Sequence, residues 1–214
     1  MQKQFHLCYH GTDMARFESV MNTAKIPQDK ASEEKNVSFP PSMKGLVNLR
    51  SGPLRAVYIG AMGYGYDLQT LIGVAERWKA EGVLPFQIHF AGKGPQLDQL
   101  KTRCRELGLI EPESELNDNP DASPVFSLTT PVVFHGFLKK DAVNELLLSS
   151  DVALVTNRSE TLVACPYKAG EYAAAGLPII SCLGGELGKL LSDWNSGSDY
   201  IEGDTASLYN AFRQ

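Results

Sequence analysis

Lys168 and Glu171 lie three residues apart, and Lys168 is the second residue after Pro166. Because proline suits the beginning of a helix, the two side chains are expected on one helical face. A cation in a first helical turn is repelled by the positive end of the helix dipole. A diphosphate bound there would be attracted to the cation and to the helix N-terminus alike. Glu171, one turn further on, is suited to accept hydrogen bonds from a ribose diol. A surface Lys–Glu pair without a ligand is the alternative interpretation.

Two glycine-bearing segments are further candidates for binding a phosphate. Residues 60–67 read GAMGYGYD, and residues 92–95 read GKGP. Each follows an apolar run and precedes a helical pattern, so its backbone amides can approach an anion. Neither the dinucleotide motif G-x-G-x-x-G nor the P-loop motif occurs. A tight turn in the first segment and a solvated Lys93 in the second are the alternatives.

An alternation of strands and helices has to position these segments. Apolar runs predict strands at 54–59, 86–91, 132–135, 152–155 and 178–182, with a weak last strand at 199–201. Amphipathic patterns between them predict helices that begin near Asp67, Leu97, Asp141, Tyr167 and Glu186. This order is typical of βαβ units, and the strands are apolar enough to be covered on both sides. We therefore expect an α/β fold, a Rossmann-like parallel sheet with helices on both faces, and ligands at the carboxyl ends of its strands.

Several local features complete the predicted organisation. Asp67 and Asp141 are predicted N-caps, and Gly108 and Gly176 are predicted to follow helix ends. His135, alone at a strand end, is interpreted as structural. The remaining segments are a short strand at 5–9, a polar connection at 22–53 and an acidic surface insertion at 111–131.

Composition excludes several classes of function. The net charge of -5 and the pI near 5.4 argue against a nucleic-acid-binding protein. The four cysteines form no close pair, so no zinc site is indicated. No signal peptide and no transmembrane segment is apparent. We expect a cytoplasmic protein that works, where its substrate requires it, at the inner face of the membrane.

Five segments together resemble the C-terminal domain of group 1 glycosyltransferases, family 4, of the GT-B fold. They are YHGTD at 9–13 with Phe17, YIG at 58–60 leading to Asp67, AGKGP at 91–95, VFHGF at 133–137, and KAGEY at 168–172 with AGLP at 175–178. In this order they resemble the interdomain segment, the first strand with its donor loop, and the motifs A-G-x-G-P, V-x-F-x-G and K-x-x-E-Y-x-A-x-G-x-P. The resemblance implies an interdomain segment and first strand at 1–21 and a nucleotide-sugar-binding domain at 54–214, one half of a GT-B fold.

The resemblance also implies roles for individual residues. Glu171 would hydrogen-bond the ribose and Lys168 would offset the diphosphate charge, which makes them the candidate catalytic residues. Phe137 would lie beside the base through backbone contacts. The implied donor-binding set is Gly60, Ala61, Met62, Gly63, Lys93, Gly94, Phe137, Arg158, Pro166, Lys168 and Glu171. The donor is expected to be linked to UDP or GDP, with no cofactor and no metal.

Two positions depart from the family pattern. Many members carry an earlier glutamate, which falls at Val163 here, and Glu160 is out of register. Many members also place an arginine and a lysine in the first donor loop, where this chain has Met62 and Tyr64. Arg158 and Lys168 are the candidates to replace that pair.

The expected function is that of the donor-binding half of a metal-independent, hexosyltransferase-like glycosyltransferase. Its acceptor, a glycan or a lipid-linked sugar, would be held by an N-terminal domain that this chain lacks, so the half alone is expected to be inactive. A GT-B-like nucleotide-sugar epimerase is one alternative, although no convincing set of acid and base residues is present. A non-catalytic nucleotide-binding or partner-docking module is the other.

Overall fold

The computed structural model describes residues 52–111, 123–127 and 129–214. The predicted strand at 5–9, the interdomain segment, nearly all of the polar connection and about half of the acidic insertion lie outside these ranges. Their predictions therefore stay untested. The described ranges contain every predicted donor-binding residue.

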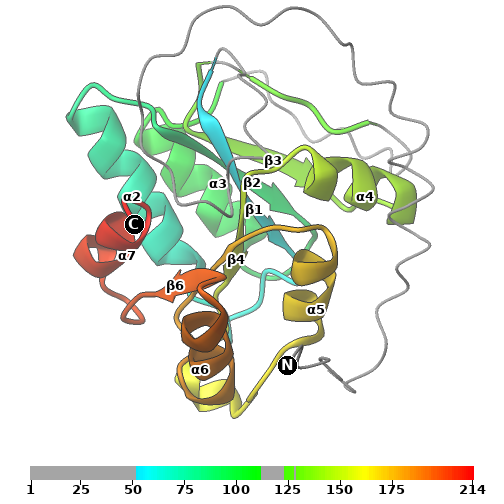
Figure 1. Cartoon of the computed structure of the whole chain (residues 1–214). Helices are drawn as coiled ribbons and strands as arrows, with labels where there is room; N and C mark the ends of the chain where they lie inside the picture. Colours follow the sequence, from blue (N-terminus) through cyan, green and yellow to red (C-terminus); the bar gives the residue numbers. More distant parts are fainter. Residues whose placement is uncertain (1–51, 112–122, 128) are drawn as a thin grey trace, which may run out of the picture.

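A six-stranded parallel sheet forms the centre of the described part (Figure 1). Its strands are β1 Leu54–Ile59, β2 Phe86–Ala91, β3 Val132–Gly136, β4 Val152–Val155, β5 Ile179–Ser181 and β6 Gly197–Asp199. The strand order is β3-β2-β1-β4-β5-β6, which is that of a Rossmann fold. The predicted fold class is confirmed, and the six strands predicted between residues 54 and 201 are present, the last of them two residues earlier than expected.

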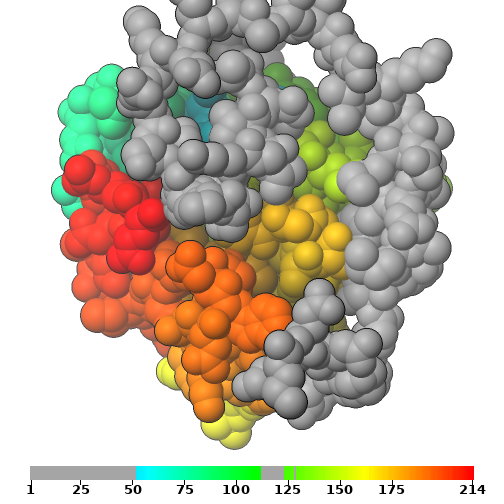
Figure 2. Space-filling model, viewed as in Figure 1, coloured from blue at the N-terminus to red at the C-terminus, as the bar shows by residue number. Residues whose placement is uncertain are grey.

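Helices cover both faces of the sheet. They are α2 Leu68–Ala80, α3 Leu97–Glu106, α4 Lys140–Leu148, α5 Tyr167–Ala174, α6 Gly185–Trp194 and α7 Thr205–Ala211. Helices α2, α3 and α7 pack on one face, and α4, α5 and α6 pack on the other (Figure 1). The C-terminal elements α6, β6 and α7 form a continuous part of the visible surface, orange to red in Figure 2.

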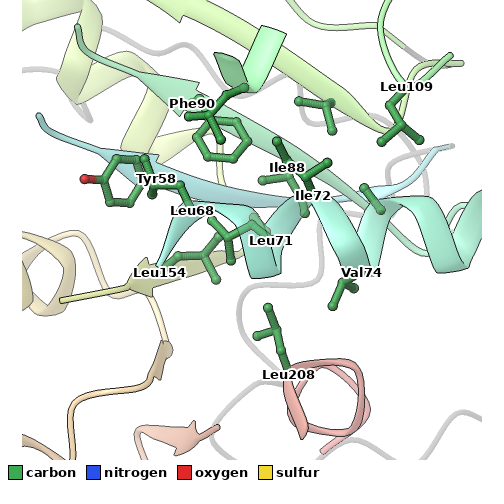
Figure 3. Packing of buried hydrophobic residues seen from close by; sticks show 14 of the residues in the cluster. Tyr58, Leu68, Leu71, Ile72, Val74, Ile88, Phe90, Leu109, Leu154 and Leu208 are labelled. Carbon is green, nitrogen blue, oxygen red and sulfur yellow. The ribbon is translucent and has the colours of Figure 1, made fainter. Parts of the chain in front are cut away.

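Alternate residues of β1 enter two separate hydrophobic cores. Ala56 and Tyr58 belong to the core beneath α2, α3 and α7, whereas Val57 belongs to the core beneath α4, α5 and α6. Figure 3 shows the first core, where Leu71 of α2 and Ile88 of β2 pack near β1. Burial on both faces explains why the strands read as almost continuous apolar runs.

The helix ends differ from prediction at two positions. Asp67 stands at the N-cap of α2, but its buried carboxylate accepts hydrogen bonds from the Thr70 hydroxyl at 2.7 Å and the Gly203 N–H at 2.9 Å, not from the backbone of α2. Helix α4 begins at Lys140, so Asp141 lies in its first turn and not at its cap. There its negative charge still complements the helix dipole. The two predicted glycines after α3 and α5 are confirmed.

Helix α7 was not expected from the sequence, because seven residues are too few to display a clear helical period. The Asp204 side chain caps it by accepting from the N–H groups of Ala206 and Ser207. The ring of Phe212, directly after the helix, meets Trp78 of α2 edge-on at 5.0 Å. This long-range contact holds α7 on the sheet.

Candidate functional site

The strand order reverses between β1 and β4, where an open α/β sheet forms its binding crevice. These two strands are in register over only two residue pairs, the second of which includes Val57. Beyond that pair, the Ile59 N–H donates to the Tyr172 hydroxyl of α5 at 3.1 Å. The loop after β1 leads to one face and the loop after β4 to the other, so the carboxyl ends of the strands separate here.

A cavity of about 330 Å³ lies at the carboxyl ends of β1, β2 and β3. It is lined by Ile59, Gly60, Ala61, Ala91, Gly92, Lys93, Phe137, Leu138 and Val143. Four of these, Gly60, Ala61, Lys93 and Phe137, are predicted donor-binding residues. The wall is mostly apolar, and the volume lies at the lower end of the range that small ligands occupy.

Three other predicted residues shape the loops and do not line the cavity. The Met62 side chain is fully buried in the core, and its N–H donates to the Lys93 carbonyl at 3.0 Å. A Cβ at Gly94 would lie 2.6 Å from the Met62 backbone, so glycine is required for the loops after β1 and β2 to touch. The Gly63 carbonyl accepts from the side chain of Gln96. These contacts hold the two glycine-bearing segments side by side.

Lys168 extends from the first turn of α5 toward the loop after β1. Its ammonium lies 4.7 Å from the ring centre of Tyr58 and 4.7 Å from that of Tyr66, within the range of cation–π interactions. Burial lowers the pKa of this ammonium to about 8, and the Glu171 carboxylate partly opposes the shift. Among the described residues, Nζ finds no hydrogen-bond partner. Because a buried charge without a hydrogen-bond partner is costly, an anion that binds beside this ammonium would stabilise it.

Gly60 provides the space that this ammonium occupies. The residue has a φ of +149°, and an added Cβ would overlap Nζ of Lys168. Gly60 also lines the cavity, whereas Lys168 does not, and its ammonium is buried next to Gly60. The structure thus brings together a glycine and a lysine that are 108 positions apart in the sequence.

Pro166 is the N-cap residue of α5, with a φ of -74° and a ψ of 147°. No side chain caps this helix through a hydrogen bond. Glu171 lies one turn after Lys168, is partly exposed, and acts electrostatically on the ammonium, in agreement with a shared helical face. The roles of these residues toward a ligand stay predictions.

Arg158, the other predicted replacement cation, is engaged by two carboxylates. Its guanidinium lies 3.2 Å from Glu202 and 3.7 Å from the buried Asp67. Glu202 also accepts from the Ser159 N–H at 2.9 Å, and the hydrogen bond from Ser159, followed by those from Arg158, lowers the pKa of its carboxyl. The arrangement ties the loop after β4 to the loops before α2 and α7. These contacts of Arg158 hold the loops beside the crevice in place, and no pattern in the sequence predicted them.

A histidine pair lies on the opposite side of β2 and β3 from α3. His89 Nδ1 and His135 Nε2 are 2.9 Å apart, and both side chains are buried. His135 occupies a register shift between the two strands. Phe126 packs beside His89, with the Arg55 guanidinium 3.7 Å from its ring centre. Phe126 of the predicted acidic insertion is therefore partly packed, although its neighbour Val125 is exposed, and the structural interpretation of His135 agrees with its position.

The histidine pair predicts a loss of stability in mild acid. Burial lowers the pKa of His89 to about 2, and His135 adds to this effect; burial also lowers the pKa of His135 to about 4. An unfolded histidine binds a proton below about pH 6.5, so between pH 6.5 and 4 the unfolded state holds more protons than the native state. The free energy of unfolding is expected to fall by as much as about 1.4 kcal/mol per pH unit for each histidine. Urea denaturation at pH 7.0, 5.5 and 4.5 measures it.

His89→Gln is the comparison for this prediction, since it removes one titrating ring and leaves the carboxylates unchanged. Its stability is expected to fall less steeply with acid than that of the original chain. Equal slopes for the two proteins would contradict the assignment to the histidine pair.

The described residues offer neither a metal cluster nor a membrane-spanning helix. They contain no group of three or more His, Cys, Asp or Glu side chains that could hold a metal ion. None of their helices has both the length and the apolarity needed to cross a bilayer.

The family of the chain follows from a sequence comparison that agrees with this geometry. Residues 53–214 match the family model described as "Glycosyl transferases group 1". The chain belongs to the group 1 glycosyl transferases. The family resemblance expected from the five motifs is confirmed, and the matched range contains every residue of the crevice described above. No curated protein sequence matches this glycosyltransferase domain.

Several solved structures share the fold at low sequence identity. WaaG, a glycosyltransferase involved in lipopolysaccharide biosynthesis, matches with a TM-score of 0.55 and 14% identity over 82% of this chain and 42% of its own. The C-terminal domain of the group 1 protein LpcC from Francisella tularensis matches with a TM-score of 0.56 and 14% identity over 76% of this chain and 74% of its own. HepE from Anabaena, in complex with UDP-glucose, matches with a TM-score of 0.55 and 13% identity over 94% of this chain and 43% of its own. The chain thus spans less than half of WaaG and HepE.

Proposed function

We propose that this domain binds a nucleoside diphosphate sugar at the carboxyl edge of its sheet, as the donor half of a glycosyltransferase. The observation that carries the proposal is the buried Lys168 ammonium, which lacks a hydrogen-bond partner among the described residues and lies beside Gly60, a residue that lines an apolar cavity of about 330 Å³. HepE, which shares the fold, has been solved with UDP and with UDP-glucose. UDP is therefore the first donor nucleotide to test, and GDP the second.

Each part of the donor has a place in this arrangement. The base lies in the cavity beside Phe137, whose exposed position leaves its backbone accessible. The ribose lies toward Glu171, which accepts hydrogen bonds from its diol. The diphosphate lies between Gly60, Lys168 and the first turn of α5, where a helix N-terminus adds to the positive potential.

Transfer breaks the bond between the anomeric carbon and the diphosphate oxygen, and the diphosphate leaves with the electron pair. A bond forms between the anomeric carbon and the acceptor oxygen, and the proton of the acceptor hydroxyl passes to the departing diphosphate. Negative charge develops on the leaving oxygen, so a cation held close to it lowers the barrier. Lys168 supplies this positive charge, and the reaction needs no metal ion.

The acceptor side belongs to the intact protein. A glycan or lipid-linked sugar bound by an N-terminal domain would complete the site, and the isolated donor domain would bind nucleotide sugar but transfer little. Assembly of a polysaccharide or lipopolysaccharide in the cytoplasm, at the inner face of the membrane, fits such a reaction. WaaG, one of the fold relatives, is involved in lipopolysaccharide biosynthesis.

Glu171→Ala tests the ribose assignment. The variant is expected to bind UDP about 10- to 100-fold more weakly at pH 7, because a charged acceptor of two ribose hydroxyls is lost. Isothermal titration calorimetry measures the affinity. Glu145→Ala, on the exposed surface of α4, is the matched control and should bind UDP like the original chain. Unchanged affinity in Glu171→Ala would remove the ribose contact from the proposal.

A further inference from the structure

Two tyrosine rings form a rigid support beneath the Lys168 ammonium. Tyr58 on β1 is almost fully buried, and its hydroxyl donates to the Ala61 carbonyl at 2.6 Å. Tyr66, in the loop before α2, meets Tyr58 edge-on with ring centres 5.9 Å apart. Its backbone forms an antiparallel bridge with Asn157 after β4. Both rings are thus fixed by the same loops that form the crevice.

We propose that Tyr58 and Tyr66 are positioning residues that hold the Lys168 ammonium above Gly60, in the place from which it receives the diphosphate of the donor. This inference rests on the proposed function of the site. A lysine side chain has several rotatable bonds, and ordering it on binding costs conformational entropy. The two rings order the side chain before the ligand arrives, and Gly60 provides the space that its ammonium occupies.

The groups around the ammonium come from three elements. On α5, the Glu171 carboxylate acts on the ammonium, and the Tyr172 hydroxyl accepts a hydrogen bond from the Ile59 N–H. On β1 and in the following loop, Tyr58 and Tyr66 present ring faces, which attract a cation but give it no hydrogen bond. Because burial outweighs the carboxylate, the ammonium holds its proton less tightly than a solvated lysine does, and its pKa falls to about 8.

This arrangement gives the site a characteristic dependence on pH. Below about pH 8 the ammonium is charged, so the affinity for a diphosphate stays nearly constant. Above the pKa, each pH unit is expected to lower the affinity by about tenfold, because the free protein must first take up a proton. Removing the Tyr66 ring admits water to the ammonium, which raises its pKa toward the solvated value of about 10.4.

The test compares Tyr66→Leu with Tyr66→Phe, which keeps the ring. UDP affinity is measured by calorimetry from pH 7 to 10, and the same series on Lys168→Gln corrects for titration of UDP itself. Tyr66→Leu is expected to bind UDP several-fold more weakly at pH 7. The alkaline midpoint of its affinity is nevertheless expected about one pH unit or more above that of the original chain. Tyr66→Phe should retain the original alkaline midpoint and most of the affinity. A purely structural role for the ring would lower the affinity without moving the midpoint, and would overturn the proposal.

A second measurement does not depend on a ligand. In protein labelled with ¹³C-lysine, the side-chain signal of Lys168 is assigned by its absence in Lys168→Gln. This signal should titrate near pH 8 in the original chain, and it should titrate near pH 8 in Tyr66→Phe as well. Titration near the solvated value in the original chain would overturn the inference, even if Tyr66→Leu fails to fold. A different result would contradict the proposed function. In that case the original chain would bind neither UDP nor GDP, independently of the pKa that the NMR titration gives for Lys168.

Discussion

Lys168→Gln is expected to weaken the binding of UDP at pH 7 by about 10- to 150-fold, the range that corresponds to the loss of a hydrogen bond to a charged group. The ammonium lies beside Gly60, a residue that lines the cavity, and under the proposed function the diphosphate binds next to it. Glutamine keeps much of the side-chain length and a hydrogen-bond donor, so the change isolates the charge. Isothermal titration calorimetry at low and moderate salt measures the effect.

A matched control is Lys189→Gln, which removes the same charge from an exposed position on α6. It should change UDP affinity by less than about twofold, since exposed charges at a distance are screened by salt. Equal losses in the two variants would indicate a general electrostatic effect and contradict a specific site. In thermal unfolding, Lys168→Gln should be no less stable than the original chain, because it replaces a buried cation without a hydrogen-bond partner among the described residues.

Trp78→Ala is expected to lower the free energy of unfolding by about 3–5 kcal/mol, the cost of truncating a buried tryptophan. Trp78 of α2 is 2% exposed. Its ring stacks on Phe86 of β2 with centres 5.8 Å apart and meets Phe212 edge-on. The change leaves a cavity between α2, the sheet and α7 that the surrounding backbone cannot fill. Urea denaturation followed by circular dichroism measures the difference.

Trp194→Ala provides the control for this substitution, because Trp194 lies at the end of α6 and is 51% exposed. Its cost is expected to stay below about 1 kcal/mol. Similar losses in the two tryptophan variants would mean that α7 and α2 do not form the compact core described here. UDP affinity should survive in whatever fraction of Trp78→Ala remains folded, because the residue lies far along α2 from the crevice.

Local patterns in the sequence predicted the elements because each pattern reports on burial of the same short segment. The strands from β1 to β5 read as apolar runs since both of their faces are covered, and the amphipathic helices α2 and α3 show one apolar side each. Each loop that joins a parallel strand to the next helix lies at the carboxyl end of that strand. The order of strands and helices therefore predicted which segments would meet at this edge of the sheet. Lys168 and Glu171 could be paired in advance because helical geometry alone separates them by about one turn.

The contacts that give these residues their properties are of a different kind. Arg158 pairs with Asp67 and Glu202, and α7 is held through the contact of Phe212 with Trp78, across sequence separations that no local period encodes. The placement of Lys168 over two tyrosine rings likewise depends on β1, its loop and α5 meeting in space. A residue's type and its neighbours along the chain predict the element in which it lies. The burial that lowers the pKa of Lys168 arises when distant segments exclude water around it, so it followed only from the folded arrangement.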